Sequence, residues 1–177
     1  MVIEIRAFDE DDLMLHEMAK LNCSVFKGSN YSSADLAEMV QTIRKHSTYP
    51  GFFGIKALND DTELIGFAYG YESTPGQFYR GKLEEQLTTA QVESWLADCF
   101  EFVELIVAPS ARKRGVGSEL HDALIGQASH RTSVLTTGIN NSPAIRLYTK
   151  KEWEVIKHDA PVLSDDNLQL IMVKKCR

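Results

Sequence analysis

Apolar residues recur along the chain with two different periods, and each period predicts a type of secondary structure. Strand patterns, in which apolar residues are dense or alternate with polar ones, occupy residues 2–7, 52–58, 63–71, 99–108, 133–137, 153–157 and 168–173. Helical spacing follows Asp9 and Ser32 and recurs at residues 80–87, 90–96, 116–128 and 142–150. This order of elements predicts an α/β (α+β) sheet fold in a single domain of residues 1–177.

Capping residues predict where three of the helices begin. Asp9 is the expected N-cap of the first helix. We expect the apolar face of that helix to include Leu13, Met18 and Leu21. Ser32, with Asp35 three residues later, is expected to open the second helix. For the last helix, Ser142 is the expected N-cap and Pro143 the first helical residue.

The composition is that of an ordinary globular domain, with 44% hydrophobic and 25% charged residues. The 19 Lys and Arg residues against 25 Asp and Glu residues give a net charge of -6. This charge disfavours nucleic acid or an anionic membrane surface as a partner, and it favours a cationic or amine partner. The N-terminal residues lack a signal-peptide pattern, and no apolar run reaches the ~18 residues of a membrane helix.

Cysteine and histidine positions bear on the compartment and on metal binding. Cys23, Cys99 and Cys176 are far apart and form no Cys-x-x-Cys pair, which indicates reduced thiols in a cytoplasmic protein. The five histidines have no metal-ligand spacing, so we expect no metal.

A basic, glycine-containing loop at residues 109–118 joins the most apolar strand to a helix. Free backbone N–H groups at the start of a helix, together with three adjacent cations in an acidic chain, favour a phosphate site. The loop lacks the spacing of a P-loop and is a poor dinucleotide fingerprint. A nucleotide-binding protein and a surface loop with incidental charge are the alternatives.

Two linked motifs resemble the GNAT superfamily of acyl-CoA-dependent N-acetyltransferases. The first is Val107-Ala108-Pro109 followed by Arg112-x-x-Gly115-x-Gly117, and the second is Asn141-x-x-Ala144-x-x-Leu147-Tyr148-x-Lys150. The resemblance implies a mixed, mostly antiparallel sheet flanked by helices. It also implies an acyl-CoA-binding core at residues 100–156 and a helical insertion at residues 73–96, between the third and fourth strands. The family often has glycine before the aromatic residue that ends the second motif, whereas here Glu152 precedes Trp153.

The resemblance also implies how acetyl-CoA is held, without a metal. The pantetheine arm would lie along the strand residues Leu105, Ile106 and Val107, and Asn141 and Ala144 would contact it. Arg112 would brace the loop. The coenzyme A pyrophosphate would bind to the loop residues Lys113, Arg114, Gly115, Val116, Gly117 and Ser118.

Glu104 is a candidate general base on the sequence pattern alone. It shares a strand face with Phe102 and Ile106, so burial should raise its pKa and suit it to accept a proton from an amine. In related enzymes a Glu at this strand position can be the general base. The alternative is a partly solvated Glu, or one paired with Lys or Arg, at the open end of the sheet.

Tyr148 shares a helix face with Ala144 and Leu147. By resemblance it would be the general acid that protonates the departing thiolate, and it would also contact the cosubstrate. The alternative is a packing tyrosine with a satisfied hydroxyl.

The expected reaction is transfer of an acetyl group to a primary amine by direct attack in a ternary complex. We expect a small-molecule amine, because carboxylates are concentrated at residues 84–104 and aromatic residues lie in segments that could line a cleft. These aromatic residues are Tyr31, Phe78, Tyr79 and Trp95. The alternatives are an acyl-CoA-binding sensor or module without transfer, and a peptide or protein N-terminal acetyltransferase. Homodimers are common in the family, so the resemblance allows one.

Overall fold

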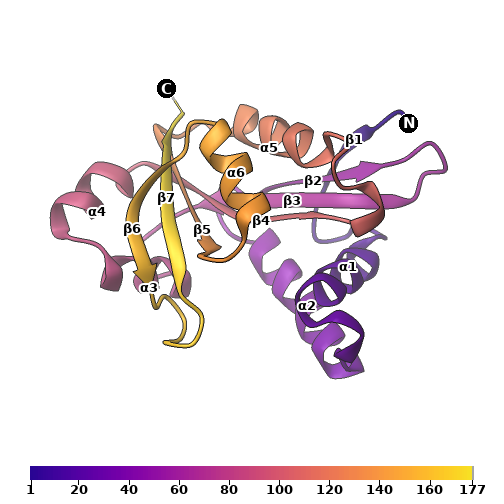
Figure 1. The fold of residues 1–177 in the computed structure, drawn as a ribbon, viewed down its shortest axis with the longest axis horizontal. Helices are drawn as coiled ribbons and strands as arrows, with labels where there is room; N and C mark the ends of the chain where they lie inside the picture. The colour runs from indigo at the N-terminus through magenta and orange to yellow at the C-terminus, as the bar shows by residue number, and fades with distance from the viewer. Residues whose placement is uncertain (177) are drawn as a thin grey trace. The chain divides into compact units, whose positions relative to one another are not determined.

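The computed structural model describes residues 1–176 and contains a seven-stranded sheet with the strand order β1-β2-β3-β4-β5-β7-β6 (Figure 1). The strands are β1 (Glu4–Phe8), β2 (Phe53–Leu58), β3 (Leu64–Glu72), β4 (Cys99–Val107), β5 (Thr132–Gly138), β6 (Glu154–Ala160) and β7 (Gln169–Lys175). The helices are α1 (Leu15–Lys27), α2 (Ser33–Ser47), α3 (Phe78–Gln86), α4 (Thr89–Trp95), α5 (Val116–Gln127) and α6 (Ser142–Lys150), with short 3₁₀ turns η1 (Gly28–Asn30) and η2 (Pro109–Ala111). The sheet is mixed, with β4 and β5 parallel and the β1–β2, β2–β3, β5–β7 and β6–β7 pairs antiparallel. The predicted fold class and the helical insertion between β3 and β4 are confirmed.

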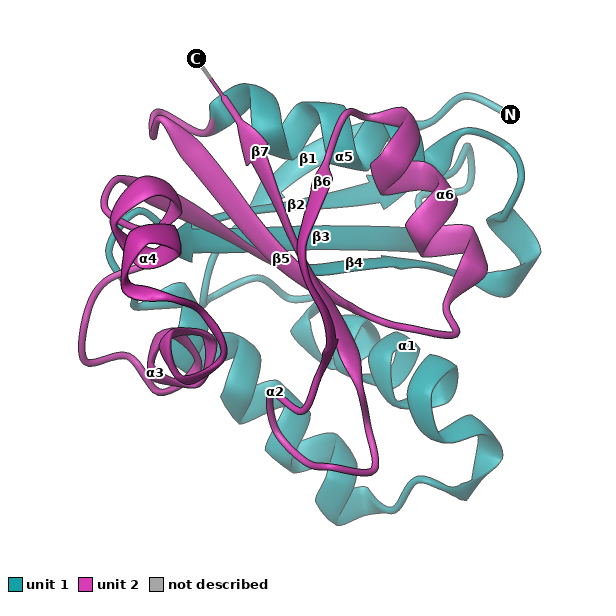
Figure 2. Cartoon of the chain, turned by 60° about the vertical axis from the view of Figure 1, so that its left-hand side comes forward, with its two compact units in different colours: residues 1–71, 104–127 teal, residues 72–103, 128–177 magenta. Residues whose placement is uncertain are grey.

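The chain forms two compact units, and each contains strands and helices (Figure 2). Unit 1 comprises Met1–Tyr71 and Glu104–Gln127. Unit 2 comprises Glu72–Val103 and residues 128–176. The strand β4 therefore contributes residues 104–107 to unit 1 and residues 99–103 to unit 2.

In unit 1, helices cover both faces of the strands (Figure 2). Leu120 of α5 lies against Gly66 of β3 on one face, and His46 of α2 bonds to the Tyr69 hydroxyl on the other. The alternation of small and aromatic residues along β3 explains this arrangement, because successive side chains of a strand point to opposite faces. The small residues admit α5 close to the backbone, and the tyrosines fill the space under α2.

In unit 1, α2 begins after its predicted capping residue, whereas α1 does not. Ser32 caps α2 and forms the predicted capping box with Asp35. The expectation for the first helix is wrong, because α1 begins at Leu15 rather than after an Asp9 cap. The turn before α1 uses Asp12, whose carboxylate accepts from Met14 N–H at 2.8 Å. Leu13 lies in this turn and is 96% exposed, so it does not belong to the apolar face of the helix.

In unit 2, β5 and β7 pair along their whole length, from Thr132 with Lys175 to Gly138 with Gln169. The pairing of β4 with β5 covers the start of both strands, from Cys99 with Thr132 to Glu101 with Val134. The insertion helices pack onto this sheet, because Leu83 of α3 and Leu96 after α4 are fully buried in the core with Val134. The insertion is therefore part of the hydrophobic core of unit 2.

The last helix differs from prediction by one residue at its start. Asn141, not Ser142, is the N-cap of α6, and its side-chain oxygen accepts from Ala144 N–H at 3.3 Å. Pro143 is consequently the second helical residue. Across the described part of the chain, no helix is both long enough and apolar enough to cross a membrane.

Candidate functional site

Glu104 lies on β4 and is half-buried in unit 1. Its Oε2 atom accepts a hydrogen bond of 3.1 Å from Nδ2 of Asn22, which lies on α1. Asn22 is only 5% exposed, so the bond is held inside the unit. The carboxylate is thus tethered by a neutral donor, not by the Lys or Arg partner considered as an alternative.

The environment of Glu104 changes its acidity. Burial raises the pKa of its carboxyl from 4.5 to about 7, although hydrogen bonds from the Leu105 backbone and the Asn22 amide lower it. Burial dominates because the ionised carboxylate loses more from desolvation than it recovers from the neutral donors. A carboxyl with a pKa near 7 can exchange a proton at neutral pH, which is the property required of a general base.

The end of β4 leads directly into the basic loop. Ile106 is buried and Leu105 and Val107 are half-buried, and the Ala108 N–H continues the pairing with β3 by bonding to the Ile65 carbonyl at 2.9 Å. Arg112 Nε donates to the Val107 carbonyl at 3.2 Å. Arg112 therefore ties the loop back to the strand, as a bracing role requires.

The loop turns sharply before α5 begins. Lys113 has φ +61° and Gly115 has φ +86°, both in the left-handed region. The first backbone bond of α5 joins the Glu119 N–H to the Gly115 carbonyl at 3.0 Å. Because a helix leaves its first N–H groups without partners in its own backbone, those of Val116, Gly117 and Ser118 are directed out of the helix start.

Lys113 and Arg114 are exposed beside this helix start. A Cβ atom added at Gly115 would meet no atom within 4 Å, so the backbone there is open to a ligand. Several N–H groups, a helix dipole and two cations suit a diphosphate such as that of coenzyme A. The residues of the loop therefore fit the group that the sequence motifs imply.

Close packing fixes the position of α5 and hence of this helix start. A Cβ atom added to Gly66 would lie 2.8 Å from the Ile106 carbonyl oxygen and 3.1 Å from Leu120 Cδ1. Only glycine fits between β4 and α5 at this point. Gly66 was not identified as important from the sequence.

The other candidate residues, Tyr148, Asn141 and Ala144, lie in unit 2 on α6 or at its start. Tyr148 is 7% exposed. Its ring makes edge contacts with Phe102 and Trp153, with ring centroids 6.0 and 5.9 Å apart. Tyr148 is thus a packed residue whose ring orientation is held by two aromatic neighbours.

The substitution of Glu152 for the usual glycine keeps the expected turn. Glu152 has φ +67°, the left-handed conformation that glycine adopts most readily. The Trp153 N–H then bonds to the Tyr148 carbonyl at 3.0 Å, which closes the end of α6.

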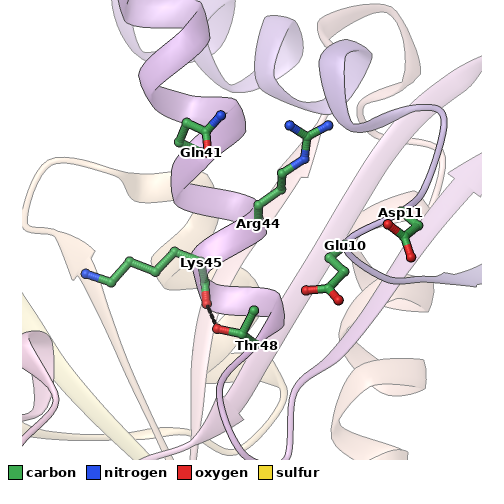
Figure 3. Close-up of a pocket in the computed structure, with 6 residues that line it drawn as sticks. All are labelled: Glu10, Asp11, Gln41, Arg44, Lys45 and Thr48. Atoms are coloured by element: carbon green, nitrogen blue, oxygen red, sulfur yellow. Dashed lines mark hydrogen bonds between the residues drawn. The ribbon is translucent and has the colours of Figure 1, made fainter.

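A second feature of unit 1 is an open hollow at its surface, between the β1–α1 connection and α2. It is lined by Glu10, Asp11, Gln41, Arg44, Lys45 and Thr48 (Figure 3). Its lining includes no predicted site residue. Within residues 1–176, no three His, Cys, Asp or Glu side chains are arranged to hold a metal ion.

Asn22 is the site residue that the sequence reasoning missed. The buried residues of α1 are Leu15, Met18, Ala19, Asn22 and Cys23. Their spacing is that of the buried stripe of a helix, and Asn22 is the polar member of this stripe. A polar residue at a predicted core position was the signal that could have identified it.

Comparisons with known proteins identify the family and the fold of the chain. The sequence profile described as "Acetyltransferase (GNAT) family" matches residues 15–152. None of the curated proteins compared with the chain matches it.

Solved structures share the fold at low sequence identity. The protein PH1933 from Pyrococcus horikoshii superposes with a TM-score of 0.72 at 18% identity, over 98% of both chains. The protein yncA from Salmonella typhimurium, with its cofactor acetyl-CoA, gives 0.71 at 14% identity over 100% of this chain and 95% of its own. A variant of spermidine N-acetyltransferase SpeG from Vibrio cholerae gives 0.66 at 16% identity over 98% and 94%.

Proposed function

Because the chain belongs to the acetyltransferase (GNAT) family, we propose that it transfers an acetyl group from acetyl-CoA to a primary amine of a small molecule, by direct attack in a ternary complex. Acetyl-CoA supplies the acetyl group as a thioester that an amine can attack. The protein residues bind the two substrates, orient them and move protons.

The observation that carries the proposal is the position of Glu104. It is a half-buried carboxyl with a pKa of about 7, on the strand that runs directly into the glycine loop. The proposed proton acceptor and the proposed anion-binding helix start therefore belong to one continuous segment of unit 1. Neither feature alone requires an acyltransferase, but their combination suits transfer from an anionic carrier to an amine.

Acetyl-CoA binding is assigned to residues of β4 and the loop. The backbone N–H groups and cations of Lys113, Arg114, Gly115, Val116, Gly117 and Ser118 would hold the pyrophosphate. Arg112 supports this role by its bond to the Val107 carbonyl. The backbone of Leu105, Ile106 and Val107 would lie along the pantetheine arm, and the Ile106 or Val107 N–H would polarise the thioester carbonyl. One such donor contributes about 10²- to 10³-fold in rate.

Residues of α6 are proposed to act at the thioester end of the cosubstrate. Asn141 and Ala144 would contact the pantetheine, and Tyr148 would donate its hydroxyl proton to sulfur. The ring contacts of Tyr148 with Phe102 and Trp153 support this role, because a proton donor needs a fixed orientation. They are equally compatible with the alternative of a packing residue, so the tyrosine needs its own test.

The proposed proton transfers balance the reaction. Glu104 accepts a proton from the amine, directly or through water. The amine nitrogen forms the new C–N bond as the C–S bond breaks. Tyr148 gives its proton to the departing sulfur, and solvent then exchanges protons with Glu104 and Tyr148. The products are an N-acetylated amine and free coenzyme A.

The small-amine acceptor is supported by the acidic net charge of -6 and by the fold shared with a spermidine N-acetyltransferase. The carboxylates of residues 84–104 support a small-amine acceptor less strongly than the composition of this segment suggested. Within unit 2, Glu84 pairs with Arg80, Glu85 with Lys82 and Asp98 with Arg131. These neighbours neutralise half of the six carboxylates.

Aromatic residues that were candidates for an acceptor cleft have different environments. Trp95 packs against the core of unit 2, and the Tyr79 hydroxyl lies 2.5 Å from Thr136 Oγ1. Phe78 is 68% exposed, with Lys82 Nζ 5.7 Å from its ring centre. Tyr31 lies between η1 and α2 in unit 1 and is half-buried. Of these four residues, Phe78 is the exposed one, and Tyr31, Tyr79 and Trp95 are all half-buried.

Calorimetric titration with acetyl-CoA, followed by a coenzyme A release assay against a panel of amines, tests the proposal. We expect Gly117→Trp to abolish acetyl-CoA binding, because the new side chain fills the helix start. Gly126→Trp is the matched control, since Gly126 is exposed at the other end of α5 and a Cβ atom added there meets no atom within 4 Å. Binding of acetyl-CoA without release of coenzyme A with any amine would indicate a binding module and overturn the proposal. Activity confined to peptides or protein N-termini would overturn the small-molecule acceptor.

The role of Tyr148 is tested separately by Tyr148→Phe, which keeps the aromatic ring. Loss of turnover by about 10²-fold or more, with unchanged acetyl-CoA affinity, is expected of a general acid. Unchanged turnover would instead identify Tyr148 as a packing residue.

A further inference from the structure

A buried amide interrupts the apolar stripe of α1. Met18 and Ala19 are fully buried on the preceding turn, and Cys23 follows Asn22 at 3% exposure. An apolar side chain at position 22 would continue this stripe. A buried amide costs free energy unless it forms hydrogen bonds, so an asparagine here needs a compensating partner.

The partner of Asn22 is Glu104, 82 positions away in the chain. Asn22 Nδ2 donates to Glu104 Oε2 at 3.1 Å, which is good geometry for a bond to a carboxylate. An amide N–H only donates, and an ionised carboxylate only accepts, so this contact favours the ionised form of Glu104. The bond also occupies one carboxylate oxygen and limits rotation of the side chain.

We propose that Asn22 is a positioning residue that holds Glu104 ionised and oriented for accepting a proton from the substrate amine. The inference rests on the proposed function, because it gives Glu104 the role of base. A neutral donor suits this task. A Lys or Arg partner would stabilise the carboxylate so strongly that it would be a weak base, and an apolar neighbour would leave it protonated.

Two other side chains on the helices of unit 1, Cys23 and His46, have pKa values shifted toward the neutral form, and the charged Lys27 and Asp35 of these helices pair with each other at 2.7 Å. Burial raises the pKa of the Cys23 thiol on α1. On α2, burial lowers the pKa of His46 to about 4, and its Nδ1 atom lies 2.9 Å from the hydroxyl of Tyr69 on β3. The direct side-chain hydrogen bond to the Glu104 carboxyl in this unit comes from Asn22. Its removal should therefore have a measurable effect on protonation.

Asn22→Leu removes the donor while keeping a branched side chain of similar length. Loss of a hydrogen bond to the ionised form raises the pKa of Glu104, so the acid limb of the pH profile of kcat/KM should move to higher pH by about one unit. Turnover at pH 6 should fall about tenfold, and turnover at pH 9 should change by less than about twofold. Asn22→Asp keeps the shape of the side chain and replaces the donor by a carboxylate, so its shift should be larger and in the same direction.

Cys23→Ala is the matched control, because it alters the neighbouring buried position of the same helix. It should leave the pH profile unchanged even if the protein is less stable. Titration of the Glu104 side-chain carboxyl by ¹³C NMR, with its signal assigned by its loss in Glu104→Gln, measures the same shift without substrate.

These measurements separate the inference from the proposed function. If neither Asn22 variant moves the NMR titration of Glu104, the positioning role is wrong even when the wild-type protein acetylates amines. If the NMR titration moves but wild-type protein releases no coenzyme A with any amine, the proposed function fails, and with it the catalytic purpose of the contact. A shift in both the NMR titration and the kcat/KM profile supports the inference.

Discussion

Gly66 on β3 lies directly against the backbone carbonyl of Ile106 on β4, where an added Cβ atom would be 2.8 Å from the carbonyl oxygen. The same added Cβ atom would lie 3.1 Å from Leu120 Cδ1 of α5. One glycine thus sets the distance between the strand proposed to hold the pantetheine and the helix proposed to hold the pyrophosphate.

Gly66→Ala should lower the free energy of unfolding by about 1 to 3 kcal/mol, because a backbone oxygen cannot move away as a flexible side chain could. Gly126→Ala in α5 is the control. No atom lies within 4 Å of its added Cβ, so it should raise stability by up to about 1 kcal/mol through helix propensity. Urea unfolding of the three proteins measures both effects. Equal stability of Gly66→Ala and the wild type would contradict the steric argument.

The raised pKa of Glu104 predicts how activity depends on pH. As the carboxyl titrates near pH 7, kcat/KM should rise with pH through this value and then level off. Glu104→Gln should lower kcat/KM by about 10²- to 10⁴-fold. The fall of kcat/KM at acid pH that is attributed to Glu104 should also disappear in this variant. A Glu104→Gln protein with wild-type turnover and an unchanged pH profile would exclude Glu104 as the base.

The same pKa predicts a pH dependence of stability. The folded protein holds the Glu104 proton up to about pH 7, whereas an unfolded chain releases it near 4.5. The stabilisation from this proton is complete below pH 4.5 and is lost as pH rises through 7. The stability of Glu104→Gln relative to wild type should therefore increase by roughly 3 kcal/mol between pH 4.5 and 8. Chemical denaturation at both pH values measures it, and a constant difference would contradict the shifted pKa.

The exposed cations of the glycine loop should affect acetyl-CoA binding through charge. A double change of Lys113→Gln and Arg114→Gln should weaken acetyl-CoA binding by about tenfold, equivalent to about 1.4 kcal/mol. It should also reduce the dependence of affinity on salt, because fewer charges are screened. Lys45→Gln and Arg44→Gln in the hollow of Figure 3 remove the same charge elsewhere and should leave the affinity within about twofold. Equal weakening by both pairs would indicate a general charge effect instead of a site.

Glu152 offers a test of backbone strain beside Trp153. Its φ of +67° strains an ordinary residue by about 1 to 2 kcal/mol. Glycine adopts this φ without strain, but it loses more conformational entropy on folding. Glu152→Gly should therefore be more stable than Glu152→Ala by up to about 1 kcal/mol in thermal unfolding. Glu152→Ala controls for the ion pair with Lys174, which is long at 3.8 Å and involves a carboxylate that is 89% exposed. The opposite order of stability would show that the turn does not strain the chain.

Elements defined by neighbouring residues could be predicted closely from the sequence. The Ser32–Asp35 capping box and the strand, glycine loop and helix around Gly115 depend on residues within a few positions of one another. Leu13 could not be placed in this way, since its exposure depends on the turn before α1. That turn involves Asp12, which also pairs with Lys56 of β2 at 2.6 Å. A contact across 44 positions is not encoded in local periodicity.

The sequence by itself determined the element order, the two family motifs and the position of Glu104 in the middle of an apolar strand. Those features follow from side-chain periods and motif spacing, which are properties of short segments. Tertiary structure alone decided that Asn22, in place of a cation, reaches Glu104, and that Gly66 must admit the Ile106 carbonyl. Each depends on how distant segments pack, because the distance between two side chains on separate elements is set by the approach of those elements and not by either segment's own pattern.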